Sequence, residues 1–420
     1  MGGLTTLAPV IGAAVPLGAD SVPIRRPREP ISPEVGAAAI VAAMTDPLPA
    51  ISLPRELLPA DGRFGCGPSK VRPEAMNALN AVSTTYMGTS HRQAMVRFTV
   101  SQLRNGLTEM LALPDGYEIM LGNGGSTAFW DIATFGLIDQ RSQHLSFGEF
   151  SSKFAGAAKA APHLADPEVI ESPPGTHPEA HASAGIDTYA LTHNETSTGV
   201  AMAPTRPEGA HEDAIVVVDA TSAAGGLRFD PSQVDVYYFA PQKCLASDGG
   251  LWLAAVSPRA IERIERIGAS DRWIPASLDL VTALDNSRKD QTYNTPALAT
   301  IFLAVQQVEW VNNNGGLEWA ASRCDRSADT MYSWAEASPF ATPFVADAAD
   351  RSHVVATIDL DDAIDANVVS QVLRDNGIVD TESYRKLGRN QLRMAMFPAI
   401  DPSDVEALTA CIDHVVTALG

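Results

Sequence analysis

The stretch YYFAPQKCLASDGGLW, from Tyr237 to Trp252, decides the fold class. An apolar run leads into Lys243, and a loop of small residues with two glycines follows before a second apolar run. A lysine rarely ends a buried strand without a partner, because burying its charge is costly. In open α/β sheets, ligands bind beyond the carboxyl ends of the strands. Lys243 is therefore a candidate for chemistry at the edge of a sheet.

Other short apolar or β-branched runs surround this stretch, at residues 117–121, 144–147, 188–192, 214–218, 234–240 and 250–257. Helix-sized segments separate several of them. One such segment, residues 91–111, places Met95, Val100, Leu103, Leu107 and Met110 at helical spacing. Runs of this kind predict strands that are buried on both faces of a mostly parallel sheet covered by helices. The predicted fold class is α/β.

The sequence NNNGG at residues 312–316 predicts a boundary between two domains. Beyond it, the pattern predicts a smaller α+β domain, with helices at 317–336, 364–374 and 403–418 and strands at 353–359 and 391–397. Residues 1–43 are rich in Ala, Pro and Gly, which predicts a disordered tail or a start codon placed too early, with Met44 as the true beginning.

The chain is acidic, with 30 Lys and Arg against 50 Asp and Glu and a formal net charge of −20. This charge argues against nucleic acid or an anionic membrane as a partner, because both require a basic surface. A small anionic substrate would need a local cluster of Arg and His. No apolar run approaches the roughly 18 residues of a membrane helix.

The compartment is predicted from the cysteines and the tail. The four cysteines, Cys66, Cys244, Cys324 and Cys411, are scattered without metal-like grouping, and the last two lie at helical spacing among apolar residues. Arg25-Arg26 resembles an export signal, but Pro27, Glu29 and a short apolar run disfavour it. We expect a reducing, cytoplasmic protein without a metal.

Polar residues follow several predicted strands. Gly124-Gly125-Ser126-Thr127 opens a helix and could cradle a phosphate; 193–196 (HNET), Asp219 and Gln242-Lys243 end three further strands. Each feature alone is typical of a turn, a helix cap or a surface lysine. Together they match pyridoxal 5′-phosphate, which requires a lysine for its Schiff base, a carboxylate beside the pyridinium nitrogen and donors for its phosphate.

In its ordered series of motifs, the sequence resembles the phosphoserine aminotransferase family, within the fold-type-I pyridoxal-phosphate enzymes. The motifs are FGCGPSK, GTSHR, GNGGST, HNETSTG, VVVDATS, YFAPQK, YNTPA and LRMAMF, and they extend from Phe64 to near the C-terminus. The resemblance implies that residues 44–84 pack on the small domain and the mouth of the active site. It further implies that 85–312 form the large cofactor-binding domain and 313–420 the small one.

The resemblance also implies roles for individual residues. Lys243 would form the Schiff base and shuttle the substrate proton, and Asp219 would contact the pyridine nitrogen. The other cofactor contacts would come from Gly125, Ser126, Phe150, Thr196 and Gln242, and from Asn294 and Thr295 of a neighbouring subunit in a homodimer. Phe150 stands where many members stack a Trp, and Ser126 where many have an Arg. Phosphate binding would then depend on hydroxyl and backbone groups.

The substrates that the resemblance implies are L-glutamate and 3-phosphohydroxypyruvate, giving 2-oxoglutarate and O-phospho-L-serine in serine biosynthesis. Arg393 would bind the α-carboxylate, a bidentate task suited to guanidinium. His91 and Arg92 would bind the distal anion, and Arg385, Lys386 and Arg389 could add positive charge. A further role in pyridoxine biosynthesis stays open.

Two alternatives compete with this interpretation. One is a related enzyme, either a cysteine desulfurase, which would need a reactive cysteine on a mobile loop, or an alanine- or serine-glyoxylate aminotransferase, for which the His91-Arg92 pair would be superfluous. The other is a noncatalytic α/β protein that binds phosphorylated metabolites without covalent chemistry.

Overall fold

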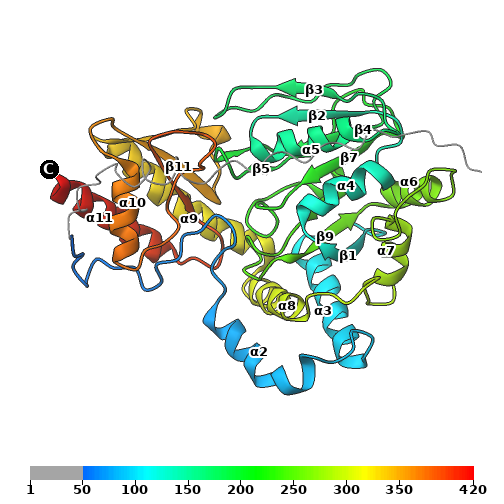
Figure 1. Ribbon diagram of the computed structural model, residues 1–420, viewed down its shortest axis with the longest axis horizontal. Coiled ribbons are helices and arrows are strands. Elements are labelled where there is room, and N and C mark those ends of the chain that lie inside the picture. The colour runs from blue at the N-terminus through cyan, green and yellow to red at the C-terminus, as the bar shows by residue number, and fades with distance from the viewer. Residues whose placement is uncertain (1–50) are drawn as a thin grey trace, which may run out of the picture. The chain divides into compact units, whose positions relative to one another are not determined.

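Seven strands form the central sheet, in the order β1-β9-β8-β7-β4-β2-β3 (Figure 1). The computed structural model describes residues 51–420, so the predictions on residues 1–43, Arg25-Arg26 and Met44 lie outside the described residues. The strands are β1 (Glu118–Gly124), β2 (Ser142–Ser146), β3 (Glu168–Glu171), β4 (Thr188–Thr192), β7 (Ile215–Asp219), β8 (Val236–Phe239) and β9 (Gly250–Val256).

Most of the sheet is parallel, as the sequence predicted. The pairs β3–β2, β2–β4, β4–β7 and β7–β8 are parallel, whereas β9 runs antiparallel to both of its neighbours, β8 and β1. The carboxyl ends of β1, β2, β4, β7 and β8 therefore lie along one edge of the sheet, where β9 begins.

Alternation along β7 and β8 explains how the sheet is buried on both faces. Val216 and Val218 join the core that contains α3 (Ala94–Met110) and α8 (Leu298–Asn313). Ile215 and Val217 join the opposite core, with α4 (Ser126–Gly136), α6 (Pro258–Gly268) and α7 (Leu280–Ser287). Successive side chains of a strand point to opposite faces, so these continuous apolar runs require helices on both sides (Figure 1).

A second sheet of three antiparallel strands, β10 (Ala341–Pro343), β11 (Val355–Leu360) and β12 (Gln391–Ala395), follows in the C-terminal part. Its core includes α9 (Gly316–Ala337), α10 (Ala366–Asp375) and α11 (Pro402–Leu419). Cys324 and Cys411 are buried in this core, as their helical spacing predicted. Phe64 and Cys66 belong to the same core, so the segment before α2 (Pro73–Tyr86) packs on the second sheet.

The remaining elements are short or lie at the borders of the sheets. They are α5 (Glu149–Ala160), the hairpin of β5 (Asn194–Glu195) and β6 (Val200–Ala201), and two 3₁₀ turns, η1 (Pro231–Gln233) and η2 (Ala348–Asp350). All of the described residues belong to one compact unit. The division at residues 84 and 312 stays a prediction. Across residues 51–420, no helix has the length and apolar character needed to cross a membrane.

The structure differs from the sequence predictions at two places. Met95 was predicted on the buried face of α3 but is 47% exposed, and the helix begins only at Ala94. Strand β3 was missed because its residues alternate between partly buried and exposed at the sheet edge.

Val→Ala substitutions, which remove two methyl groups, should show how differently the central strand β7 and the edge strand β3 contribute to stability. Val217 is fully buried in β7, whereas Val169 in β3 is 38% exposed. We expect Val217→Ala to lower the free energy of unfolding by about 2 kcal/mol, from lost burial and the cavity left behind. Val169→Ala should change it by less than about 0.5 kcal/mol. Urea denaturation of both variants at equal protein concentration measures the difference, and equal losses would contradict this description of the sheet.

Candidate active site

A cavity of about 630 Å³ lies at the carboxyl ends of the central strands. Seven of the predicted site residues line it: Gly125, Ser126, Phe150, Thr196, Asp219, Gln242 and Lys243. The remaining predicted residues, His91, Arg92, Asn294, Thr295 and Arg393, are not part of its lining. The structure thus brings together the predicted lysine, carboxylate and glycine turn, which come from three different strand ends.

Lys243 presents a buried amine to this cavity. Its Nζ donates a hydrogen bond to the carbonyl of Cys66. The pKa of Lys243 is lowered to about 8, chiefly by burial, since the charged form loses its hydration, and to a smaller extent by the positive charge of Arg393. Gly67 passes so close that a Cβ there would lie 2.0 Å from Nζ, and its φ of +138° also favours glycine.

Asp219 ends β7 on the face that α4 covers, because it follows Ile215 and Val217 in the alternation of the strand. Its Oδ2 accepts from the indole N–H of Trp130 at 3.2 Å and from the Tyr238 hydroxyl at 3.1 Å. Its Oδ1 accepts from both the backbone N–H and the hydroxyl of Thr221. Burial raises the pKa of Tyr238 well above its usual value, so this phenol stays protonated and serves as a donor. Four donors therefore hold a carboxylate in a fixed orientation.

The glycine turn after β1 leads into an uncapped helix N-terminus. Helix α4 starts at Ser126, and no side chain caps it at Gly125. The first N–H groups of a helix have no acceptor within the helix and carry partial positive charge. Gly125, Ser126 and Thr127 line the cavity, and the hydroxyl oxygens of Ser126 and Thr221 lie within hydrogen-bond distance of each other, 2.6 Å apart. This arrangement suits an anion such as a phosphate.

Thr196 lines the cavity from the turn after β5 and is fixed from behind. Its hydroxyl donates to Ser222 Oγ at 2.8 Å, and the amide of Asn194 donates to the same oxygen at 2.8 Å. Phe150, from the first turn of α5, supplies an aromatic wall, and its ring centroid lies 6.1 Å from that of Tyr384.

Arg393 lies beside the cavity, although it does not line it. One of its guanidinium nitrogens donates to the carbonyl of Thr196 at 3.1 Å, and its guanidinium carbon lies 5.2 Å from the centre of the Tyr384 ring. Its Nε is buried and has no hydrogen-bond partner among residues 51–420. The Nε–H of Arg393 is therefore free to donate a hydrogen bond to a ligand beside the cavity.

The other predicted residues form a separate group near the end of β1. Thr295 Oγ1 lies 3.2 Å from His91 Nδ1, and the amide of Asn123 donates to the carbonyl of Thr295 at 2.9 Å. Arg92 is exposed. The side-chain oxygen of Asn294 accepts from the N–H of Thr295, and its backbone carbonyl accepts from the Thr292 hydroxyl. Burial lowers the pKa of His91, and the charge of Arg92 adds to this effect.

Several lining residues were not assigned from the sequence. They are Gly67, Pro68, Ala128, Trp130, Thr192, Thr221, Ser222, Asp248 and Gly249. Gly124, Thr127 and Asn194 also line the cavity and belong to the predicted glycine turn and to the stretch 193–196. Gly67 and Pro68 lie in the motif FGCGPSK, Asn194 in HNETSTG, and Thr221 and Ser222 in VVVDATS. The motifs therefore already pointed to these parts of the chain. Nothing in the sequence indicated Trp130, because a Trp in an apolar helix is typical of core packing. Only the packing of α4 against the sheet brings its indole N–H to Asp219.

Comparison with known proteins identifies the family. The family model described as aminotransferase class-V matches residues 64–382. The phosphoserine aminotransferase of a Nocardioides species is 62% identical over 377 residues, covering 90% of this chain and 100% of that protein. That of Corynebacterium glutamicum is 59% identical over 365 residues, covering 87% of this chain and 97% of the relative.

Solved structures show the same fold at lower identity. The phosphoserine aminotransferase of Cytophaga hutchinsonii superposes with a TM-score of 0.78 at 23% identity, covering 84% of this chain and 99% of that one. The enzyme of Bacillus circulans subsp. alkalophilus gives a TM-score of 0.75 at 22% identity, covering 86% and 99%. The predicted fold is thereby confirmed, and the extent of the match leaves a single assignment: this chain belongs to the class-V aminotransferases.

Proposed function

We propose that the chain is a pyridoxal-phosphate-dependent phosphoserine aminotransferase, which moves the amino group of L-glutamate to 3-phosphohydroxypyruvate. The observation that carries this proposal is the joint placement of the Lys243 amine and the Asp219 carboxylate on one cavity beside the open N-terminus of α4. The names of the relatives at 62% and 59% identity support the same activity.

The donor set of the cavity fits pyridoxal 5′-phosphate. The N–H groups of Ser126 and Thr127 and the Ser126 hydroxyl suit a phosphate, with Gly125 leaving the backbone open and Gln242 nearby. Asp219 suits a protonated pyridine nitrogen, Thr196 a ring hydroxyl, and Phe150 the face of a ring. When bound, this cofactor would supply an aldehyde carbon for the amino group and a ring that accepts electrons from the substrate.

Lys243 would both hold the cofactor and move the substrate proton. With a pKa of about 8, about a tenth of its amine is uncharged at pH 7, far more than for an ordinary lysine. An uncharged amine is the nucleophile that attacks an aldehyde and the base that takes a proton from Cα. The four donors around Asp219 keep this carboxylate in place opposite the amine.

Arg393 would bind the α-carboxylate that both substrates share, because it lies against Thr196 and its Nε has no hydrogen-bond partner among residues 51–420. For the distal anion, we propose His91 and Arg92. Of the three further cations considered, Lys386 pairs with Glu149 and Arg389 with Asp359, so these two are already engaged by carboxylates.

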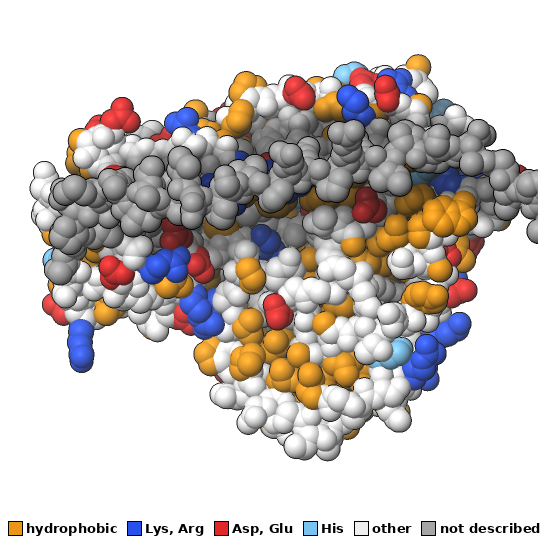
Figure 2. All heavy atoms as spheres, in the orientation of Figure 1, with side chains coloured by type: hydrophobic (Ala, Val, Ile, Leu, Met, Phe, Trp, Pro, Cys, Tyr) orange, Lys and Arg blue, Asp and Glu red, His pale blue; other side chains and the backbone are white. Residues whose placement is uncertain are grey.

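The separation of His91, Arg92, Asn294 and Thr295 from the cavity supports a homodimer in which they serve the site of the other subunit. Exposed apolar side chains lie close to this group along the chain: Met87, Met95, Phe98 and Tyr293, with Phe98 63% exposed; Met76 in α2 is exposed as well. Figure 2 shows hydrophobic side chains gathered over the region of α2 and α3. A contiguous apolar patch of this kind is typical of an interface, and we propose that a second copy of the chain covers it.

The remaining expectations follow from this proposal. Four free, buried cysteines suit the reducing cytoplasm. Their burial also argues against a cysteine desulfurase, which needs an accessible thiol. A role in pyridoxine biosynthesis would require only another phosphorylated keto acid in the same site.

The activity itself is the first test. With pyridoxal phosphate and L-glutamate, the protein should aminate 3-phosphohydroxypyruvate with a kcat/KM at least about a hundredfold higher than for glyoxylate, which lacks the distal anion. Lys243→Ala should abolish turnover and remain a dimer by light scattering. Preference for glyoxylate would favour the related glyoxylate enzymes, and turnover by Lys243→Ala would remove the lysine from the mechanism.

The ionisation of Lys243 can be measured without substrate. In the cofactor-free protein, the rate at which an amine-selective reagent labels Lys243 should rise with pH to a midpoint near 8, rather than near the ordinary lysine value of 10.5, because burial disfavours the charged amine. Peptide mass spectrometry at a series of pH values gives the midpoint. Nα-acetyl-lysine, whose ε-amine is free and fully hydrated, is the control. A midpoint near 10 would mean that the amine is not desolvated.

Mixed dimers test which subunit uses Arg92. Arg92→Ala alone should raise KM for 3-phosphohydroxypyruvate at least about tenfold, because a charge-assisted contact is lost. If Arg92 serves the neighbouring site, coexpression with Lys243→Ala creates dimers with one complete site, and random pairing should restore about a quarter of wild-type activity at low substrate. The absence of any recovery would show that Arg92 acts within its own chain.

A further inference from the structure

Glu195 is a fully buried carboxylate without a cationic partner. It lies in β5, its exposed fraction is 0%, and the ion pairs within residues 51–420 do not include it. Burying an unpaired charge is costly unless hydrogen bonds replace its hydration. Burial raises the pKa of Glu195, and hydrogen bonds from Ser151 and Ser197 oppose that shift.

The hydrogen bonds to this carboxylate come from the first turn of α5 and from Ser197. Oε2 accepts from the N–H of Phe150 at 3.1 Å and from the N–H and the hydroxyl of Ser151, both at 2.9 Å. Oε1 accepts from the N–H of Ser197 at 3.2 Å and from its hydroxyl at 2.7 Å. Three of these five contacts are backbone N–H groups, which can only donate, so the position requires an acceptor group.

Glu195 thereby completes the N-terminus of α5, whose first N–H groups have no acceptor within the helix. Glu195 serves the N–H groups of Phe150 and Ser151, while Ser197 Oγ accepts from the N–H of Glu149 at 3.0 Å. A carboxylate is also the group that the positive end of a helix favours. The contact is so close that a Cβ at Gly148 would lie 2.3 Å from Glu195 Cγ.

The same carboxylate joins two walls of the cavity. Phe150, whose N–H it accepts from, lines the cavity from α5, and the residue that follows Glu195, Thr196, lines it from the turn after β5. Among residues 51–420, the Glu195 carboxylate is the only hydrogen-bond acceptor of the Phe150 N–H. The position of the aromatic ring relative to the Thr196 hydroxyl therefore depends on Glu195.

We propose that Glu195 is a positioning residue for Phe150, which sets the ring of Phe150 against the bound cofactor by anchoring the first turn of α5. This proposal rests on the proposed function, because it concerns the face that the cofactor ring would contact. Glu195 itself lies behind the cavity wall and takes no part in proton transfer.

Glu195→Gln is the sharpest test, because it preserves the shape and replaces one acceptor oxygen by an amide donor facing N–H groups. We expect the dissociation constant for pyridoxal phosphate to rise about tenfold, as for one buried hydrogen bond lost. We also expect the circular dichroism that the protein induces in the bound cofactor to decrease, since this signal reports the orientation of the ring. Ser197→Ala, a milder change, should shift both readouts in the same direction if Glu195→Gln does not fold.

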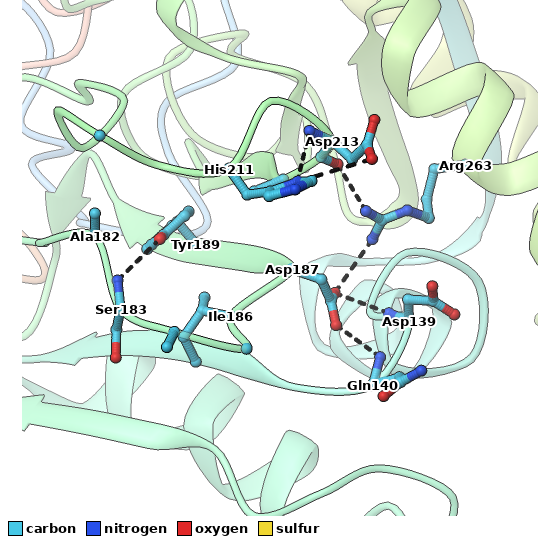
Figure 3. A pocket seen from close by; sticks show the side chains of 14 residues that line it. Asp139, Gln140, Ala182, Ser183, Ile186, Asp187, Tyr189, His211, Asp213 and Arg263 are labelled. Atoms are coloured by element: carbon cyan, nitrogen blue, oxygen red, sulfur yellow. Dashed lines mark hydrogen bonds and ion pairs between the residues drawn. The ribbon is translucent and has the colours of Figure 1, made fainter.

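Asp187 offers a matched control at the opposite edge of the sheet. It precedes β4 and accepts the N–H groups of Asp139, Gln140 and Arg141, and Arg263 pairs with it at 3.2 Å (Figure 3). Strand β4, about 17 Å long at 3.3 Å per residue, runs between the two carboxylates. Asp187→Asn should lower the denaturation midpoint at least as much as Glu195→Gln does, yet leave the dissociation constant and the dichroism within about twofold of wild type.

A double substitution decides whether Glu195 acts through Phe150. In the Phe150→Ala background, Glu195→Gln should change the dissociation constant by less than about twofold, because coupled residues are not additive. Full additivity, or a wild-type dissociation constant and dichroism in Glu195→Gln, would overturn the proposal while leaving the proposed function intact. Failure of the wild-type protein to bind pyridoxal phosphate would instead overturn the proposed function.

Discussion

The parallel register of β4, β7 and β8 is the constraint on which the site depends. Thr192, Asp219 and Tyr238 pair side by side across these three strands. Residues in one row of a sheet point to the same face, so the Tyr238 hydroxyl meets the Asp219 carboxylate, and Thr192 lies on the same cavity. If one of these strands shifted by one residue, its side chain in this row would point to the opposite face of the sheet. Thr192, Asp219 and Tyr238 would then no longer lie side by side.

The site concentrates positive charge within a protein whose net charge is −20. Arg393 lies close enough to Lys243 for its charge to lower the pKa of that amine, and the N-terminus of α4 adds partial positive charge. Two anionic groups, the Asp219 carboxylate and an incoming substrate or phosphate, would balance these cations. The fields of the exposed acidic residues are screened within about 10 Å at ordinary ionic strength, so the charges nearest the cavity dominate its electrostatics.

The sequence could predict those parts of the fold and site that depend on local pattern. Continuous apolar runs indicated the central strands, and the residue after each run indicated the cavity edge, which is why Lys243, Asp219 and the glycine turn were found. Strand β3 and Trp130 could not be found in this way. The alternation in β3 is weak at an edge, and the indole of Trp130 reaches Asp219 only through the packing of α4 on the sheet. Glu195 lay within a noticed motif, but its partners on α5 are 44 and 45 residues away.

The turn at Gly67 links the reactive amine to the other sheet. Phe64 and Cys66 are packed in the core of β10, β11 and β12, whereas the Cys66 carbonyl and Gly67 touch Lys243 in the seven-stranded half. Ser69 adds two bonds to the backbone of Gln242 and Lys243 on the far side of the same turn. A rigid-body tilt of the C-terminal core would therefore pull directly on the surroundings of the Lys243 amine, so that a movement of this core and the burial of that amine would be mechanically coupled.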